Sequence, residues 1–286
     1  MHNTNNNFIL PSNAHIGQVE LKISDLEQSL AFYAGVLGLQ VLSKDGEQAR
    51  LASGSPLDLI RLQELPSARR KPPRTTGLYH VAIRLPDRHA LGAIFQRLLE
   101  QRYPLQGAAD HLVSEAIYLA DPDGNGLELY TDRPRSEWPR LNGQVSMSTD
   151  PLDAAGLLSS ASPGWNGIHP ATDIGHIHLQ VSDLEQAETF YCGLLGFEVT
   201  QRSYPGALFV SAGGYHHHLG LNTWAGLGAF PPPPEAVGLG SFQVAVPDAQ
   251  ERQKLVQRLQ AAGIQLQAHN NGTWRLNDSD GNSIEI

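Results

Sequence analysis

Two stretches of this 286-residue chain decide its fold: QVELKISDLEQSLAFYAGVLGLQV at residues 18–41 and HIHLQVSDLEQAETFYCGLLGFEV at residues 176–199. Twelve of their 24 aligned positions are identical. Two further pairs match with them, GLYHVAIRLPD (77–87) with GLGSFQVAVPD (238–248) and DPDGNGLEL (121–129) with DSDGNSIEI (278–286). The three offsets are 158, 161 and 157 residues, so the chain consists of two near-duplicate halves.

Each half divides again into two similar quarters. Every quarter opens with an alternating apolar and polar run, which is typical of a strand, and continues through Ser or Pro and then Asp into a helical pattern. Ser24 with Glu27, and Ser182 with Glu185, have the S-x-x-E spacing of a capping box at the start of a helix. Glycine-rich turns and short apolar runs follow each helix and predict two or three more strands.

The sequence therefore predicts an α+β fold of four βαβββ modules, at residues 15–65, 77–132, 173–226 and 238–286. Residues 1–14 form an N-terminal tail, and residues 133–172 form a linker between the second and third modules. The linker contains LDAAGLL (152–158), which suggests one helix. At 40 residues it is long enough to let modules meet that are not neighbours in the sequence.

The composition narrows the class of protein. The chain is 41% hydrophobic and 17% charged with a formal net charge of −9, and this acidic balance argues against binding to nucleic acid. Its single cysteine, Cys192, excludes an intrachain disulfide and fits a reducing compartment. The N-terminus lacks the features of a signal peptide, and no apolar run approaches the roughly 18 residues of a membrane helix. We expect a soluble, cytoplasmic protein.

Three consecutive histidines lie in GGYHHHLGLNTW (213–224), a segment with the pattern of a strand. On a strand, His216 and His218 would share one face and His217 would point to the other. No single role explains all three, so we expect at least one of them to serve chemistry or to pack in a polar pocket. His216 and His218 could also form a polar outward face.

Four modules with these motifs resemble the vicinal oxygen chelate superfamily, which includes glyoxalase I, bleomycin-resistance proteins and the extradiol ring-cleaving dioxygenases. The resemblance extends from about residue 15 to the end and rests on SDLEQSLAFYAGVLGL, SDLEQAETFYCGLLGF and the two D-x-D-G-N-x-[LI]-E endings. It implies that modules pair, that their mixed sheets curl into two cups with helices outside, and that a divalent metal lies inside a cup. The ligands would come from the first strand of each module and from a glutamate near the last strand.

The ligand positions that the resemblance implies are Gln18, His80, His176 and Ser241 on first strands, and Glu128 and Glu285 near last strands. Pairing the modules in sequence order, the simpler expectation, never brings two histidines and a glutamate together. If the second module faces the third, the set becomes His80, His176 and Glu128. Two histidines and one carboxylate with open positions favour non-haem Fe(II), although the ligand types do not distinguish it from Mn(II).

Further residues of the second and third modules match the extradiol dioxygenases. These enzymes hold a His-His pair late in the module that provides the first metal-binding histidine, and His216 and His217 occupy that place here. They also hold a tyrosine ten residues before the glutamate, which corresponds to Tyr118, and a histidine in the loop before that tyrosine, which corresponds to His111. The fourth module has Arg275 where the second has its tyrosine. We therefore expect the active cup to form from modules two and three, and modules one and four to form a degenerate cup.

The function that the resemblance implies is extradiol ring cleavage of a catechol-type aromatic by O2. His217 would move a substrate proton as acid–base catalyst, and Tyr118 and His111 would hydrogen-bond to the oxygens. Two alternatives stay open: a glyoxalase-type lyase or isomerase with Ni(II) or Zn(II), and a non-catalytic cup that binds a small aromatic molecule. We also expect a homodimer.

Each residue also has a structural explanation when it is taken alone. A single histidine on a strand is more often packed or exposed than a metal ligand, Glu128 could be a surface carboxylate, and Tyr118 could pack in the core. The combination of His80, His176 and Glu128 at positions defined by the repeat is what favours a metal site.

Overall fold

The computed structural model describes residues 8–161, 164–269 and 272–286, and they form an α+β fold. The first quarter contains β1 (His15–Ile23), α1 (Leu26–Leu30) with its π-helical continuation η1 (Ala31–Val36), β2 (Gln40–Asp45), β3 (Gln48–Ala52) and β4 (Ile60–Glu64). The second contains β5 (Gly77–Arg84), α2 (Arg88–Glu100), β6 (Leu105–Asp110), β7 (Ser114–Ala120) and β8 (Gly126–Asp132).

The second half repeats this order of elements. The third quarter contains β11 (Asp173–Gln180), α4 (Leu184–Glu188) with η3 (Thr189–Leu194), β12 (Glu198–Gln201), β13 (Ala207–Ser211) and β14 (Leu219–Asn222). The fourth contains β15 (Gly238–Ala245), α5 (Ala249–Ala261), β16 (Gln267–Ala268), β17 (Trp274–Asn277) and β18 (Ser283–Glu285). Between the halves lie η2 (Arg135–Glu137), the hairpin β9 (Arg140–Leu141) and β10 (Gln144–Val145), and α3 (Ala154–Ser159), which is the expected linker helix.

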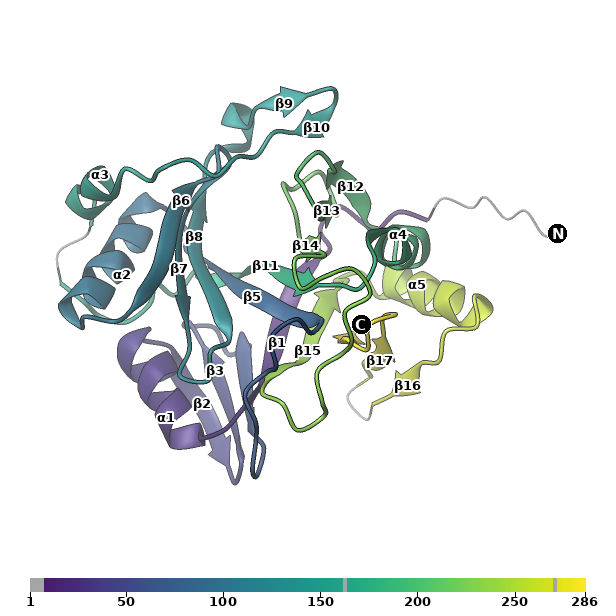
Figure 1. The fold of residues 1–286 in the computed structure, drawn as a ribbon, viewed down its shortest axis with the longest axis horizontal. Coiled ribbons are helices and arrows are strands. Elements are labelled where there is room, and N and C mark those ends of the chain that lie inside the picture. The colour runs from purple at the N-terminus through teal and green to yellow at the C-terminus, as the bar shows by residue number, and fades with distance from the viewer. Residues whose placement is uncertain (1–7, 162–163, 270–271) are drawn as a thin grey trace.

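The strands form two mixed sheets of eight, each built from two quarters. The first sheet has the order β16-β17-β18-β15-β1-β4-β3-β2 and joins the first quarter to the fourth, while the second has the order β12-β13-β14-β11-β5-β8-β7-β6 and joins the second to the third. Antiparallel pairs β1–β15 and β5–β11 make the two junctions. Figure 1 shows β5 and β11 between the groups β6–β8 and β12–β14, with the helices on the outside. The expected fold class is confirmed, and the second quarter meets the third.

Aspartates start the helices. Asp25, Asp87, Asp183 and Asp248 are the N-cap residues, and each side chain accepts a hydrogen bond from a backbone N–H in the first turn. The capping boxes predicted at Ser24 and Ser182 are therefore wrong: in both motifs the aspartate that follows the serine is the cap.

The serines instead connect the two sheets. Ser24 donates its backbone N–H and its hydroxyl to Asp123, in the DPDGN turn of the second quarter. Nearby, the buried Tyr33 donates its hydroxyl to Asp121 of the same turn at 3.0 Å. The second half repeats the arrangement, because Tyr191 donates to Asp278 at 2.7 Å. Both repeated motifs thus connect sequence-adjacent quarters that belong to different sheets.

A continuous hydrophobic core extends over both sheets and includes the first helix of each quarter. Of the predicted N-terminal tail (1–14), residues 1–7 lie outside the described part of the chain, whereas Leu10 and Ala14 are buried and Leu10 donates its N–H to the carbonyl of Gly196. Among the described residues, no helix is both long enough and apolar enough to span a membrane.

Candidate metal centre and its pocket

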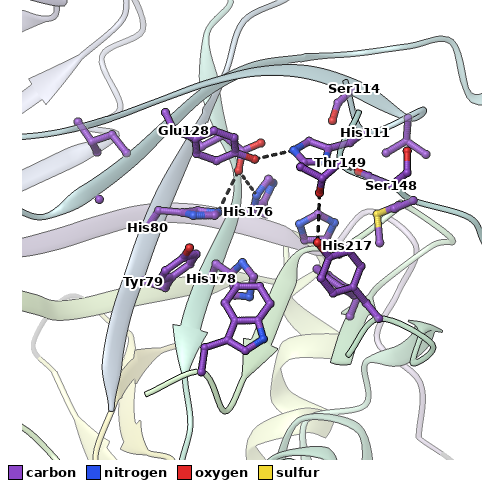
Figure 2. Close-up of a pocket in the computed structure, with 18 of the residues that line it drawn as sticks. Tyr79, His80, His111, Ser114, Glu128, Ser148, Thr149, His176, His178 and His217 are labelled. Carbon is purple, nitrogen blue, oxygen red and sulfur yellow. Dashed lines mark hydrogen bonds and ion pairs between the residues drawn. The ribbon is translucent and has the colours of Figure 1, made fainter. Parts of the chain in front are cut away.

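A cavity of about 390 Å³ opens on one face of the second sheet. Its wall is rich in histidine and aromatic side chains, drawn from both quarters of that sheet and from the linker (Figure 2). A cavity of this size, about 300–1,000 Å³, is typical of a small-molecule site. The lining residues include Tyr79, His80, His111, Tyr118, Glu128, Met147, Thr149, His176, His178, Tyr204, Phe209, His217 and Trp224.

Strand register brings the three expected ligands together. Ala82 on β5 pairs with Glu128 on β8 at one side and with His176 on β11 at the other. His80 lies two residues before Ala82, so its side chain points to the same face of the sheet. The fully buried methyl group of Ala82 leaves that face open between the three larger side chains.

The potential ligand atoms of these residues converge. Nε2 of His80 lies 3.0 Å and Nε2 of His176 lies 3.2 Å from the same oxygen, Oε2 of Glu128 (Figure 2). One ligand atom from each residue can be chosen so that all three lie within 4.8 Å of one another. All three side chains are buried, and within the described residues this is the cluster of histidine, cysteine and carboxylate groups that could hold a metal ion.

The electrostatics keep Glu128 and His176 in the form that binds a cation. Burial alone would raise the pKa of Glu128, but His176 and His80 hold it well below its usual range, so the carboxylate is ionised. Burial lowers the pKa of His176 to about 4, so its imidazole is neutral near pH 7. Nε2 of His80, although 3.0 Å from Oε2 of Glu128, makes no hydrogen bond with it and has no other hydrogen-bond partner. A buried carboxylate between two imidazoles, one with an orphaned nitrogen, fits a divalent metal with two nitrogen ligands and one oxygen ligand.

Tyr118 and His111 form a hydrogen-bonded pair at the edge of this cluster. Nδ1 of His111 lies 2.6 Å from the carbonyl oxygen of Ser148, so Nδ1 carries the proton. Nε2 of His111 then accepts from the hydroxyl of Tyr118 at 2.6 Å. Burial and the charge of Glu128 raise the pKa of Tyr118 well above its usual value, so the phenol stays protonated.

His217 lines the cavity beside the cluster. Its ring centroid lies 4.1 Å from that of His176 and 4.9 Å from that of Phe209. Burial, and next the neighbouring imidazole of His176, lower the pKa of His217 well below 6.5. The ring is therefore neutral at neutral pH.

The predicted strand geometry of the triple histidine is wrong. His216, His217 and His218 lie in an irregular segment between β13 and β14, and all three are buried, so neither His216 nor His218 faces outward. His218 accepts the N–H of Ala212 at its Nδ1 (3.1 Å). His216 bridges to Asp132 at the end of β8, with 2.9 Å between Nε2 and Oδ1. The segment packs back against the sheet because its histidines find partners there.

Sequence reasoning missed His178, which lies two residues after His176 on the same face of β11 and also lines the cavity. Its Nε2 is buried and has no hydrogen-bond partner. A β-carbon at Gly220 would lie 2.8 Å from this ring, so glycine makes the space for it. The available signal was its spacing: His178 lies two residues after His176, and on a strand this spacing places both side chains on the same face. The linker contribution of Met147, Ser148 and Thr149 had no local signal at all.

The first sheet carries the corresponding but altered set. Gln18 donates to Glu285 at 3.2 Å and Ser241 at 3.4 Å. Arg275, at the position of Tyr118 in the repeat, contacts Glu285 at 2.5 Å. The guanidinium supplies the positive charge that a buried carboxylate requires, so this second cup is closed by an internal ion pair.

Comparisons with known proteins agree with the geometry. The model of the Glyoxalase/Bleomycin resistance protein/Dioxygenase superfamily matches residues 15–129 and 173–286. The catechol-2,3-dioxygenase of Bacillus subtilis (strain 168) is 48% identical over 269 residues, which cover 92% of this chain and 93% of that protein.

Solved structures share the fold at low sequence identity. A candidate dioxygenase from Bacillus subtilis subsp. subtilis str. 168 matches with a TM-score of 0.68 at 12% identity, covering 98% of this chain and 86% of its own. Glyoxalase I from Zea mays matches with a TM-score of 0.58 at 14% identity, covering 96% and 92%. The same architecture therefore occurs in a protein described as a dioxygenase and in one described as a glyoxalase.

Proposed function

The chain belongs to the Glyoxalase/Bleomycin resistance protein/Dioxygenase superfamily, and from this premise we propose that it is an extradiol dioxygenase, which opens the ring of a catechol-type substrate with O2. The observation that carries the proposal is the convergence of His80, His176 and Glu128 at the floor of a cavity that His217 also lines. The name of the relative at 48% identity, catechol-2,3-dioxygenase, supports the same reaction.

His80, His176 and Glu128 would hold the metal, which we propose is Fe(II). When bound, the metal would supply open coordination positions for the two catechol oxygens and O2. The imidazole of His176 is already neutral and the carboxylate of Glu128 already ionised, as metal ligation requires. Phe209, Tyr79 and Trp224 line the cavity and would pack against the aromatic ring of the substrate.

The surrounding side chains handle protons. His217 is neutral and accepts the proton of a catechol hydroxyl as the substrate binds, and it returns that proton to an oxygen of the opened product. The hydroxyl of Tyr118 donates a hydrogen bond to His111. The lone pairs of the same oxygen can accept a hydrogen bond from the second substrate hydroxyl. Both oxygen atoms of O2 enter the product, so the balance requires no other reductant.

An anaerobic reconstitution tests the proposal. The purified chain is loaded with Fe(II), mixed with catechol and exposed to air, and we expect oxygen uptake together with a yellow ring-opened product. A Gln18→Ala variant serves as matched control, because Gln18 lies in the other sheet and should leave activity and iron unchanged. No uptake with a series of catechols, together with stoichiometric Zn or Ni in the purified protein, would instead support a lyase.

Two further expectations belong to this proposal. The lone cysteine and the aromatic diol substrate suit a cytoplasmic enzyme. We also propose a homodimer, which sedimentation of the iron-loaded protein would reveal as a mass of twice 31.1 kDa.

A further inference from the structure

His216 connects His217 to a carboxylate that the proposed reaction does not use. Nδ1 of His216 lies 2.7 Å from Nδ1 of His217, and Nε2 of His216 lies 2.9 Å from Oδ1 of Asp132. We propose that Asp132 and His216 are positioning residues that fix the tautomer of His217. This inference rests on the proposed function, because it concerns the group that accepts the substrate proton.

The first step of the argument is the direction of the bond between His216 and Asp132. A carboxylate only accepts hydrogen bonds, and Asp132 accepts from Arg84 at 3.2 Å and from the hydroxyl of Tyr215 at 3.0 Å. Nε2 of His216 therefore carries a hydrogen. Arg84 also donates to Asp173, at 2.9 and 2.6 Å. In the proposed arrangement His216 has the tautomer in which Nε2–H is its single N–H group.

The second step follows from the valence of a neutral imidazole, which has one N–H and one lone pair. With its hydrogen on Nε2, His216 presents a lone pair at Nδ1. The short separation from Nδ1 of His217 then requires the hydrogen between them to belong to His217. The Nε2 of His217 is left without a hydrogen, and it is the nitrogen that remains for a substrate in the cavity that His217 lines.

The fixed tautomer matters because the other one cannot act as base. If Nδ1 of His216 were the donor, His217 would carry its hydrogen on Nε2 and would face the catechol hydroxyl as a donor. A tautomer set by a hydrogen bond at the other ring nitrogen is a general device for orienting histidine. Here a second histidine relays the constraint from the carboxylate.

Asp132→Asn is the decisive variant. Arg84 contacts Oδ2 of Asp132 and must still face an acceptor, so the amide NH2 group takes the position of Oδ1 and donates to Nε2 of His216. The chain of donors then inverts, and Nε2 of His217 becomes protonated. We expect kcat/KM for catechol to fall about 100-fold, the lower range for loss of a general base, with bound iron unchanged. The matched control is Tyr215→Phe, which removes another donor from the same carboxylate and should change kcat/KM less than about threefold.

Two measurements distinguish control of the His217 tautomer by Asp132 from a purely structural role of Asp132. In a His217→Phe background, Asp132→Asn should cause no further loss, because the relay has no target; equal losses in both backgrounds would overturn the proposal. ¹⁵N-histidine NMR of the Zn(II)-loaded protein should show His217 protonated at Nδ1 in the wild type and at Nε2 in Asp132→Asn. An unchanged tautomer would also overturn it.

A second variant guards against misfolding of the first. His216→Phe breaks the relay in surroundings that accept an aromatic ring, since Trp138 and Tyr215 pack against His216 at 5.2 and 4.1 Å between ring centroids. We expect a mixture of His217 tautomers in this variant, and a single Nδ1–H form would refute the relay. The NMR readout does not depend on turnover, so absence of oxygen uptake in the wild type would refute the proposed function alone.

Discussion

Replacement of His218 by asparagine should remove one component of the acid sensitivity of the metal-free protein. Burial, followed by the charges and imidazoles around it, lowers the pKa of His218 from 6.5 to about 3. Its Nδ1 accepts the N–H of Ala212, which only the neutral ring can do. The amide oxygen of asparagine can take over this acceptor role, so His218→Asn keeps the hydrogen bond and loses the titration.

The magnitude follows from proton linkage. Below pH 6.5 the unfolded chain binds a proton at His218 while the folded chain does not, so the free energy of unfolding falls as the pH falls, until about pH 3. The slope approaches about 1.4 kcal/mol per pH unit once the unfolded-state histidine is protonated, so this residue alone lowers the free energy of unfolding by about 2 kcal/mol between pH 6.5 and 4.5. The His218→Asn variant lacks this loss.

Urea denaturation of EDTA-treated protein, followed by circular dichroism at several pH values, measures the effect. The quantity of interest is the difference in free energy of unfolding between wild type and His218→Asn, because other acid-sensitive groups cancel in it. We expect this difference to shift in favour of the variant by about 2 kcal/mol from pH 6.5 to 4.5. A difference that stays constant with pH would refute the conclusion that His218 is buried in neutral form.

Three further predictions concern the candidate metal centre. Glu128→Gln should fold but bind iron at least about tenfold more weakly, because the amide has no charge to balance the cation; metal analysis and circular dichroism check this. His217→Phe should retain its iron and lose ring cleavage by about 100-fold or more, as an oxygen electrode would show; loss of the iron as well would mean that His217 is a ligand. Ala82→Leu should destabilise the fold by about 1–3 kcal/mol and weaken iron binding, because the larger side chain enters the space between Glu128 and His176. Denaturation and metal titration of Ala82→Leu would show the two effects, and normal iron binding would contradict the assigned floor of the site.

Much of the candidate site could be predicted because the resemblance to the vicinal oxygen chelate superfamily implies ligand positions, which the repeat then locates in each module. The helix-opening aspartates locate His80 and His176 on first strands, and the D-x-D-G-N turns locate Glu128 near a last strand. Residue type then supplies the chemistry, since histidine nitrogen and carboxylate oxygen are common ligands of divalent metals. The structure does bring these three together, with Tyr118 and His111 at their edge.

Other features of the structure could not be predicted from local sequence patterns. The triple histidine has the alternation of a strand, but it lies in an irregular segment because His216 and His218 find hydrogen-bond partners in the folded protein. The serines of the S-D-L-E-Q motifs look like helix caps, yet they contact turns of another quarter. A side chain that can bond locally or at long range is decided by what the fold brings near it.

The sequence by itself determined the four modules and the α+β class, because periodicity and repeats are properties of short segments, and its motifs carried the resemblance that implied which residues could bind a metal. Only the tertiary structure decided that β5 pairs with β11, which puts His80, His176 and Glu128 in one cup and leaves Gln18, Ser241 and Glu285 to be closed by Arg275. It also decided the link from Asp132 through His216 to His217, whose ends are 85 positions apart in the sequence. Such contacts depend on strand register and on burial between distant segments, and neither is written in the local pattern of the chain.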